Sequence, residues 1–280
     1  MPKRPILRYH GGKWMLAPWI ISQFPAHRVY CEPFGGGGSV LLQKQRAYSE
    51  VYNDMDEEVV NLFRVVRDRG PELAQTLELT PFSRADFEQS YLPAEDEIER
   101  ARRLVVRSLM GFGSAVTRPN RDGSPMRTGF RCVSNNSGTP PAGDWRNYPA
   151  GLPALIERLR GVVIENKDAM DVMARFDSPA TLHYVDPPYV HDTRKADAGG
   201  TIRAYRYEMT DAQHRDLAAF LRTLKGPVIV SGYACELYDQ ELFADWERIE
   251  KTGPFADGAN ERTEVLWLRN VHHDLFPSHG

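Results

Sequence analysis

Short apolar runs alternate with helical spacings of apolar residues along much of the chain. The runs at 28–34 (RVYCEPF) and 49–54 (SEVYND) have strand length, and helical periodicity follows them at 39–47 and 56–68. Ser39 is expected to cap the first of these helices. A strand–helix–strand–helix order predicts a parallel sheet.

The alternation stops near residue 70 and resumes near residue 161. The interval contains two helical patterns, and its stretch 111–151 is rich in Gly, Ser, Asn and Pro, which predicts loops or a hairpin. Five more strands are expected at 161–166, 181–186, 226–233, 246–251 and 263–270, with helices at 169–176 and 210–224 and a short one from about 235. The last two strands have no helix between them, so they should pair antiparallel. We therefore predict an α/β protein with a seven-stranded, mostly parallel sheet and an insertion between its second and third strands.

The fourth apolar run ends in Asp186-Pro187-Pro188-Tyr189. Two prolines fix their φ angles and restrict the residues before them, so the strand must stop in a rigid bend. A carboxylate and an aromatic ring, which we expect to be exposed, are left at the tip of that bend. The tetrapeptide alone fits either an ordinary turn or a site that needs these two groups at a fixed spacing.

A glycine-rich turn, Gly35–Gly38, follows the first strand, and Asp54 closes the second. Glycine lets the backbone approach a ligand closely, and an acid about 20 residues further on suits the ribose hydroxyls of an adenosine-containing ligand. No Gly-Lys-Ser/Thr follows, so the turn is not a P-loop. Glu32 and Asp54 give the pocket an acidic character that disfavours a pyrophosphate and suits a cofactor with a positive centre. S-adenosylmethionine has that centre and the ribose.

Charge and composition narrow the class of protein. Over 280 residues the formal net charge is −3, so a role in nucleic-acid binding needs a local basic patch. Residues 100–131 hold eight arginines against the single acid Asp122, which fits either a solvated surface or a phosphate-binding one. The three cysteines show no paired spacing, which argues against disulfides and against a zinc site. With no apolar run of about 20 residues and no signal-peptide pattern, we expect a cytoplasmic protein without membrane contact.

Taken in order, several segments resemble the Dam-type family (alpha class, D12) of adenine-specific DNA methyltransferases. These segments are RYHGGKWMLAPWI, YCEPFGGGGSV, YNDMDEE, DPPY, YRYEMTDAQHRDLAAFL and NERTEVLWLRN, and they span nearly the whole chain. The resemblance implies the Rossmann-like fold of S-adenosylmethionine-dependent methyltransferases, with a catalytic domain formed by 1–69 and 159–280. It also implies a mainly helical target-recognition insertion, 70–158, that carries a β-hairpin. The implied reaction is methyl transfer to the N6 amino group of an adenine flipped out of double-stranded DNA.

The resemblance also implies roles for individual residues. Asp186 and the carbonyl of Pro187 would accept the two amino hydrogens of the adenine, and Tyr189 would stack on its ring. The implied cofactor-binding residues are Tyr9, Lys13, Phe34, Gly35, Asp54, Asp168 and Asp186. The family more often has tryptophan where this chain has Tyr9, and Asp168 and Lys13 also fit a helix cap and a surface charge. An Asp186 turned inward into an ion pair would contradict these roles.

The insertion provides candidates for DNA contact. The stretch TRPNRDGSPMRTGFR has the Asn-Arg-Asp-Gly signal of a hairpin turn between arginines. We expect the hairpin to enter a groove of DNA, with Arg118, Asn120, Arg121 and Arg127 as phosphate or base contacts. Two tyrosines that follow the turn at 186–189 (the catalytic turn), Tyr205 and Tyr207, fit either DNA contact or core packing.

Rival functions differ in their chemistry. A cytosine carbon-5 methyltransferase needs a nucleophilic cysteine, normally after proline, and none of Cys31, Cys132 and Cys235 follows one. A cytosine amino-group (N4) methyltransferase usually has serine in place of Asp186 and stays an alternative, as does a catalytically silent DNA-binding relative. RNA or protein-glutamine methylation would use the same fold, although the arginine-flanked hairpin suits duplex DNA better. The sequence does not distinguish a restriction-linked enzyme from a phage-borne or housekeeping one.

Overall fold

The fold was analysed in a computed structural model of the chain. The structure describes residues 1–9, 11–113, 120, 126–132, 139–190, 207–253 and 262–271. Within this part of the chain, no helix has both the length and the apolar character that crossing a bilayer requires.

A single seven-stranded sheet organises the described residues, in the order β3-β2-β1-β4-β5-β7-β6. The strands are β1 (Val29–Glu32), β2 (Ser49–Asn53), β3 (Val162–Glu165), β4 (Thr181–Val185), β5 (Val228–Tyr233), β6 (Glu247–Gly253) and β7 (Arg262–Arg269). The first five strands pair in parallel, whereas β7 runs antiparallel to both β5 and β6. The predicted fold class is confirmed, including the seven strands, the mostly parallel sheet and the C-terminal antiparallel hairpin.

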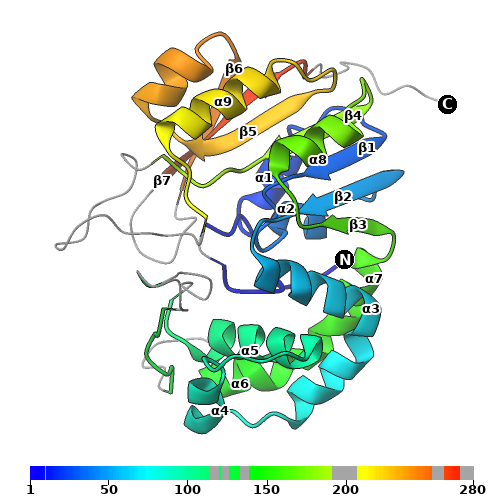
Figure 1. Cartoon of the computed structure of the whole chain (residues 1–280), viewed down its shortest axis with the longest axis vertical. Coiled ribbons are helices and arrows are strands. Elements are labelled where there is room, and N and C mark those ends of the chain that lie inside the picture. The colour runs from blue at the N-terminus through cyan, green and yellow to red at the C-terminus, as the bar shows by residue number, and fades with distance from the viewer. Residues whose placement is uncertain are drawn as a thin grey trace.

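Helices cover both faces of this sheet (Figure 1). The helices α1 (Ala17–Ile21) and α2 (Ser39–Gln43) pack on one face, and α8 (Ala169–Phe176) and α9 (Asp211–Leu221) pack on the other. Successive strand residues alternate between the two cores, as the period of a strand requires. In β1, for example, Tyr30 joins the first core and Cys31 the second.

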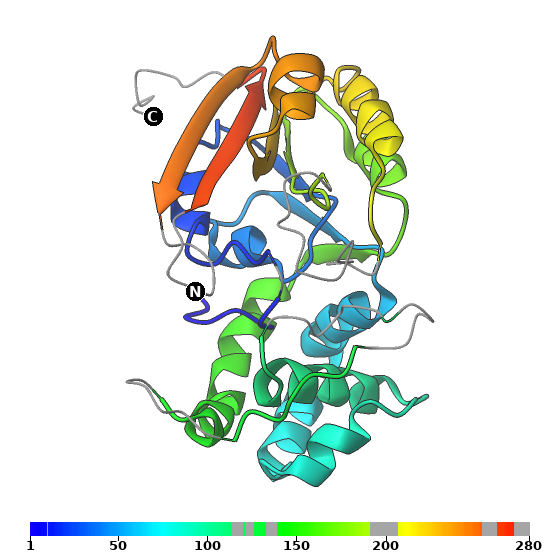
Figure 2. The same ribbon diagram turned by 90° about the vertical axis from the view of Figure 1, so that its left-hand side faces the viewer.

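The chain between β2 and β3 forms a second, helical body (Figures 1 and 2). It contains α3 (Glu57–Leu79), α4 (Arg84–Gln89), α5 (Glu97–Met110), α6 (Pro141–Asn147) and α7 (Leu152–Leu159). Helix α3 leads from the sheet into this body and bends at Arg69, where the backbone leaves helical values just before Pro71. Proline removes a hydrogen bond and clashes with the preceding turn, which explains the bend. The predicted boundary at 69–70 therefore falls inside one bent helix.

Two local expectations were wrong. Ser39 is not the cap of α2 but its first residue, because Gly38 occupies the cap position with φ of 60°, in the left-handed region. Helix α6 lies inside the stretch expected to be loops. It is stabilised from outside its own sequence, since the indole N–H of buried Trp145 donates to the Thr80 carbonyl at 2.9 Å.

The arms of the expected hairpin are paired at their base. Gly111 and Phe130 form an antiparallel bridge, and the N–H of Arg131 donates to the Met110 carbonyl at 2.7 Å. The predicted tip, with Arg118 and Arg121, lies outside the described residues.

Candidate active site

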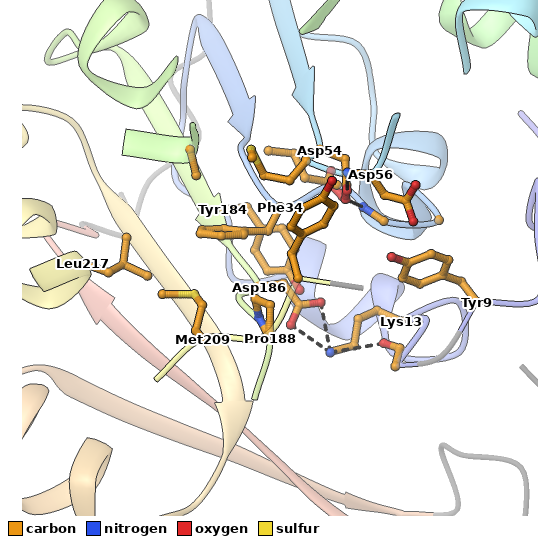
Figure 3. Close-up of a pocket in the computed structure, with 18 of the residues that line it drawn as sticks. Tyr9, Lys13, Phe34, Asp54, Asp56, Tyr184, Asp186, Pro188, Met209 and Leu217 are labelled. Atoms are coloured by element: carbon orange, nitrogen blue, oxygen red, sulfur yellow. Dashed lines mark hydrogen bonds and ion pairs between the residues drawn. The ribbon is translucent and has the colours of Figure 1, made fainter. Parts of the chain in front are cut away.

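A cavity of about 300 Å³ opens at the carboxyl ends of β1, β2 and β4 (Figure 3). The chain leaves β1 toward β2 on one side and reaches β4 on the other, which is the switch point where open α/β sheets bind ligands. The lining comes from residues within 9–13, 32–40, 54–56, 168–170, 184–188 and 207–217. All the predicted cofactor-binding residues are among them. Of the predicted catalytic residues, Asp186 lines the cavity, whereas Pro187 and Tyr189 do not.

The glycine turn is held rigidly against the end of β2. The N–H of Gly35 donates to the Asn53 carbonyl at 2.8 Å, and the N–H of Gly36 donates to Asp54 Oδ2 at 2.7 Å. A Cβ on Gly35 would lie 2.1 Å from Cε2 of the Tyr52 ring, and Gly36 has a φ of 47°. Both positions therefore need glycine, and the turn presents bare backbone to the cavity.

Asp54 is tied into the turn as well as facing the cavity. Its Oδ1 accepts a hydrogen bond from the N–H of Asp56 at 2.7 Å, in addition to the Gly36 bond at Oδ2. Burial raises the pKa of Asp54 to about 6, and these backbone N–H groups oppose that rise by stabilising the carboxylate. The carboxylate thus lies at the rim of the turn, where a hydroxyl of a bound ligand could reach it.

Glu32 does not contribute the negative charge that the sequence suggested. It is 2% exposed, and its Oε2 accepts hydrogen bonds from the Tyr30 hydroxyl at 2.7 Å and from the Leu41 N–H at 3.0 Å. Burial raises its pKa to about 8, so the group is largely protonated at neutral pH. The acidic character of the cavity comes instead from the aspartates that line it, among them Asp54 and Asp186.

Asp186 follows β4 directly, and its carboxylate faces the cavity together with Lys13. Both carboxylate oxygens lie 3.0 Å from Lys13 Nζ, and Figure 3 shows the pair at the cavity wall. The pKa of Asp186 is raised to about 6. Burial is the main cause, the negative charge of Glu264 adds to the rise, and the positive charge of Lys13 opposes it. The ion pair thus exists, but it lines the cavity instead of lying behind it in the core.

Tyr189 is buried, contrary to the expectation of an exposed ring. It is 7% exposed, and its ring packs edge-on against Tyr233 with centroids 4.5 Å apart. Its hydroxyl donates to Glu264 Oε1 at 3.0 Å and also contacts Lys13 Nζ. The bend made by the two prolines directs the side chain back toward β5 and β7, which sequence alone could not indicate.

The remaining predicted cofactor-binding residues lie at the cavity wall. Tyr9 and Phe34 project into it from the N-terminal segment and from the glycine turn (Figure 3). Asp168 lines the cavity and also caps α8, accepting from the N–H groups of Met170 at 2.8 Å and Asp171 at 3.3 Å. The helix-cap interpretation of Asp168 is therefore confirmed, and its contact with a cofactor stays a prediction.

Sequence reasoning missed several residues of this site. Tyr184, Met209 and Leu217 line the cavity, and Glu264 lies behind it. Tyr184 could have been found, because it lies two residues before Asp186 in a strand and so shares its face.

The predicted DNA-contact residues are only partly described. Asn120 and Arg127 are exposed, and the Arg127 guanidinium lies 5.4 Å from the centroid of the Tyr91 ring. Tyr207 is also exposed, while Tyr205 is outside the described residues.

Part of the arginine cluster is neutralised within the helical body. Arg102 and Arg103 both pair with Glu99 at 2.6 Å, and Arg100 pairs with Glu58 at 2.8 Å. These three arginines, which lie on α5, therefore fit a role in ion pairs within the protein better than contact with nucleic acid.

Comparison with known proteins shows which proteins the chain resembles. The model of the D12 class of N6 adenine-specific DNA methyltransferases matches residues 9–110. Similar proteins include the Type II methyltransferase M1.LlaDCHI of Lactococcus lactis subsp. cremoris, which is 25% identical over 94% of both chains. The DNA adenine methylase of Serratia marcescens is 28% identical over 87% of this chain and 86% of its own length. The chain is therefore similar to the D12 class of adenine-specific DNA methyltransferases over residues 9–110, and to these two methyltransferases over most of its length. A family of methyltransferases implies a methyl donor.

Proposed function

We propose that this protein transfers a methyl group from S-adenosylmethionine to the N6 amino group of adenine in double-stranded DNA. The observation that carries the proposal is the Asp186 carboxylate, which faces a cavity bounded by the glycine turn and Asp54. The fold places these groups at one sheet edge although they lie far apart in the sequence.

The chemistry of the cavity fits S-adenosylmethionine. Its volume of about 300 Å³ is in the range of small-molecule sites, and its carboxylates suit a sulfonium cation better than a pyrophosphate. Phe34 and Gly35 would contact the cofactor, and Asp54 would accept from the ribose hydroxyls. The other proposed contacts are Tyr9, Lys13, Asp168 and Asp186. When bound, the cofactor supplies an electrophilic methyl group.

The residues after β4 would prepare the adenine amino group. Its lone pair is delocalised into the ring, so attack requires the nitrogen to become more tetrahedral and to shed positive charge. The Asp186 carboxylate would accept one amino hydrogen and the Pro187 carbonyl the other, and the fixed φ angles of the prolines hold the two acceptors at a constant spacing. Lys13 occupies both oxygens of Asp186 in the structure, so it must withdraw from at least one when the base arrives.

Tyr189 is proposed as the surface on which the flipped base stacks. Its ring does not line the cavity and is held by Tyr233 and Glu264, so a base could stack on it only after a local opening. The insertion, residues 70–158, is proposed to hold the duplex, with Arg118, Asn120, Arg121 and Arg127 as contacts.

Methyl transfer with labelled cofactor, followed by nucleoside analysis of the product DNA, tests this function. We expect N6-methyladenine from the wild type and a loss of about 100- to 1,000-fold for Asp186→Ala, the range attributed to a group that stabilises developing charge. The exposed Asp245→Ala, whose partner is Arg222 on the surface, is the matched control and should retain activity.

The other outcomes distinguish the alternatives. N4-methylcytosine in the product would establish the cytosine amino-group reaction, and DNA binding without any transfer would establish a silent relative. Sequencing of modified bases in DNA from expressing cells would give the recognition site at the same time.

A further inference from the structure

A buried carboxylate behind the cavity, that of Glu264, contacts both Tyr189 and Lys13. Glu264, on β7, is 3% exposed. Its Oε1 accepts from the Tyr189 hydroxyl at 3.0 Å and from the Ser231 hydroxyl at 2.8 Å, and lies 3.4 Å from Lys13 Nζ. One carboxylate oxygen of Glu264 thus contacts Tyr189 and also Lys13, which is paired with Asp186.

The sheet fixes this carboxylate in place. Glu264 and Tyr233 are paired residues of the antiparallel strands β7 and β5, so their side chains are neighbours across the ladder. Tyr233 contacts the Tyr189 ring, and Glu264 accepts a hydrogen bond from the Tyr189 hydroxyl. Two residues paired across the strands therefore constrain the Tyr189 side chain. A rotation of the Tyr189 ring would have to break both contacts.

The same carboxylate offers Lys13 a second partner. Lys13 Nζ is 3.0 Å from both oxygens of Asp186 and 3.4 Å from Glu264, and the lysine is 5% exposed. A lysine that left Asp186 without another anion nearby would become an unpaired buried charge, which is strongly unfavourable. Glu264 lies close enough for the ammonium to shift by a small movement and stay paired.

We propose that Glu264 is a positioning residue for methyl transfer, which holds the Tyr189 ring and receives Lys13 when the adenine amino group takes its place on Asp186. This inference rests on the proposed function. It assigns a role to a residue on β7, outside the cavity lining, and it explains why a carboxylate is buried there at the cost of its hydration.

A merely structural role for Glu264, neutralising Lys13, makes a different prediction. It would lower thermal stability without a specific effect on turnover in the folded enzyme. The positioning role predicts that Glu264→Gln lowers kcat at saturating DNA and cofactor by about 10- to 100-fold, the loss expected for a charge-assisted contact made during catalysis. The affinity for S-adenosylmethionine should change by less than about threefold, since Glu264 is not among the residues that line the cavity.

A double-mutant cycle separates the two roles. Tyr189→Phe keeps the ring and removes the hydroxyl that Glu264 holds, so the effects of Glu264→Gln and Tyr189→Phe on kcat should overlap and not multiply. DNA with 2-aminopurine at the target position gives a second readout, because stacking on Tyr189 quenches the fluorescence of the flipped base. We expect the quenching to be weaker in Glu264→Gln than in the wild type. The matched control is Glu250→Gln, on the neighbouring strand β6, where the side chain is exposed and pairs with Arg248.

The outcomes are distinct. A folded Glu264→Gln enzyme with wild-type kcat and quenching overturns the inference, and so do effects that multiply in the cycle. If Glu264→Gln does not fold, Ser231→Ala removes a donor from the same oxygen and should lower kcat by about two- to tenfold; wild-type turnover of that variant would then overturn it. Absence of methyl transfer in the wild type would instead refute the proposed function itself.

Discussion

Replacing Gly35 by alanine tests how the glycine turn is built. The new Cβ would lie 2.1 Å from Tyr52 Cε2 and 2.6 Å from Cδ2, whereas carbon atoms pack at about 3.5–4.0 Å. One of the two groups must therefore move by roughly 1.4 Å. The Tyr52 ring is fully buried and stacked on Phe63 with centroids 4.1 Å apart, and its hydroxyl donates to the Gly36 carbonyl at 2.7 Å.

Neither movement is free. A displaced ring overpacks the core, which costs about 1–3 kcal/mol, and loses a hydrogen bond worth about 1 kcal/mol. The sum of about 2–4 kcal/mol lowers the melting temperature by roughly 4–16 °C for a domain of this size. A displaced turn moves into the cavity instead, and the Kd for S-adenosylmethionine should rise at least about tenfold, equivalent to about 1.4 kcal/mol.

Thermal unfolding and calorimetric titration with the cofactor measure the two effects together. Gly143→Ala is the matched control, because it lies in α6 and its Cβ would meet the end of the Thr139 side chain at 3.1 Å and Pro140 Cδ at 3.8 Å, an ordinary contact. Its melting temperature should not fall. A Gly35→Ala protein with both wild-type stability and wild-type Kd would refute the steric reasoning.

Three further predictions concern charge. The kcat/KM of methyl transfer should fall as the pH drops through about 6, because Asp186 of the free enzyme takes up a proton there and can no longer accept from the amino group. Since its folded-state pKa is raised, this group favours folding below about pH 4 and loses that contribution as the pH rises to about 6. A melting temperature that fell in parallel with kcat/KM on acidification would therefore contradict this explanation. Glu50→Gln should destabilise the protein by about 3–5 kcal/mol in denaturant unfolding, because Glu50 pairs with Lys44 at 2.7 Å and Arg158 at 2.6 Å in a buried cluster; an unchanged unfolding midpoint would show that the two cations do not need it. Arg121→Ala should weaken DNA binding and lower its salt dependence by about one unit of slope if it contacts a phosphate, with cofactor affinity intact; unchanged DNA affinity would exclude the hairpin tip from the interface.

Much of the architecture could be predicted from the sequence because the relevant signals are local. Strands buried on both faces are continuous apolar runs, and the helices between them repeat apolar residues every 3.6 positions. The seven strands and their order along the chain can therefore be predicted from short segments of sequence. Asp54 and Asp186 could be placed at one sheet edge for the same reason, since each directly follows a parallel strand. The resemblance to the D12 class added the chemistry to that geometry.

Other features depended on contacts between distant residues. Helix α6 forms where local composition predicts loops, because burial of Trp145 and its hydrogen bond to Thr80 outweigh weak intrinsic propensity. The protonated state of Glu32 likewise follows from complete burial, which no property of its sequence neighbours reveals.

The contacts around Asp186 show this division most clearly. The sequence by itself determined that a carboxylate and a tyrosine follow β4 on a rigid bend, because proline restricts the backbone wherever it occurs. Only the tertiary structure decided that the tyrosine turns inward and that Lys13 and Glu264, from opposite ends of the chain, meet it there. Such contacts depend on how the sheet brings its strands together, and the sequence around a charged residue does not indicate which distant residue it will pair with.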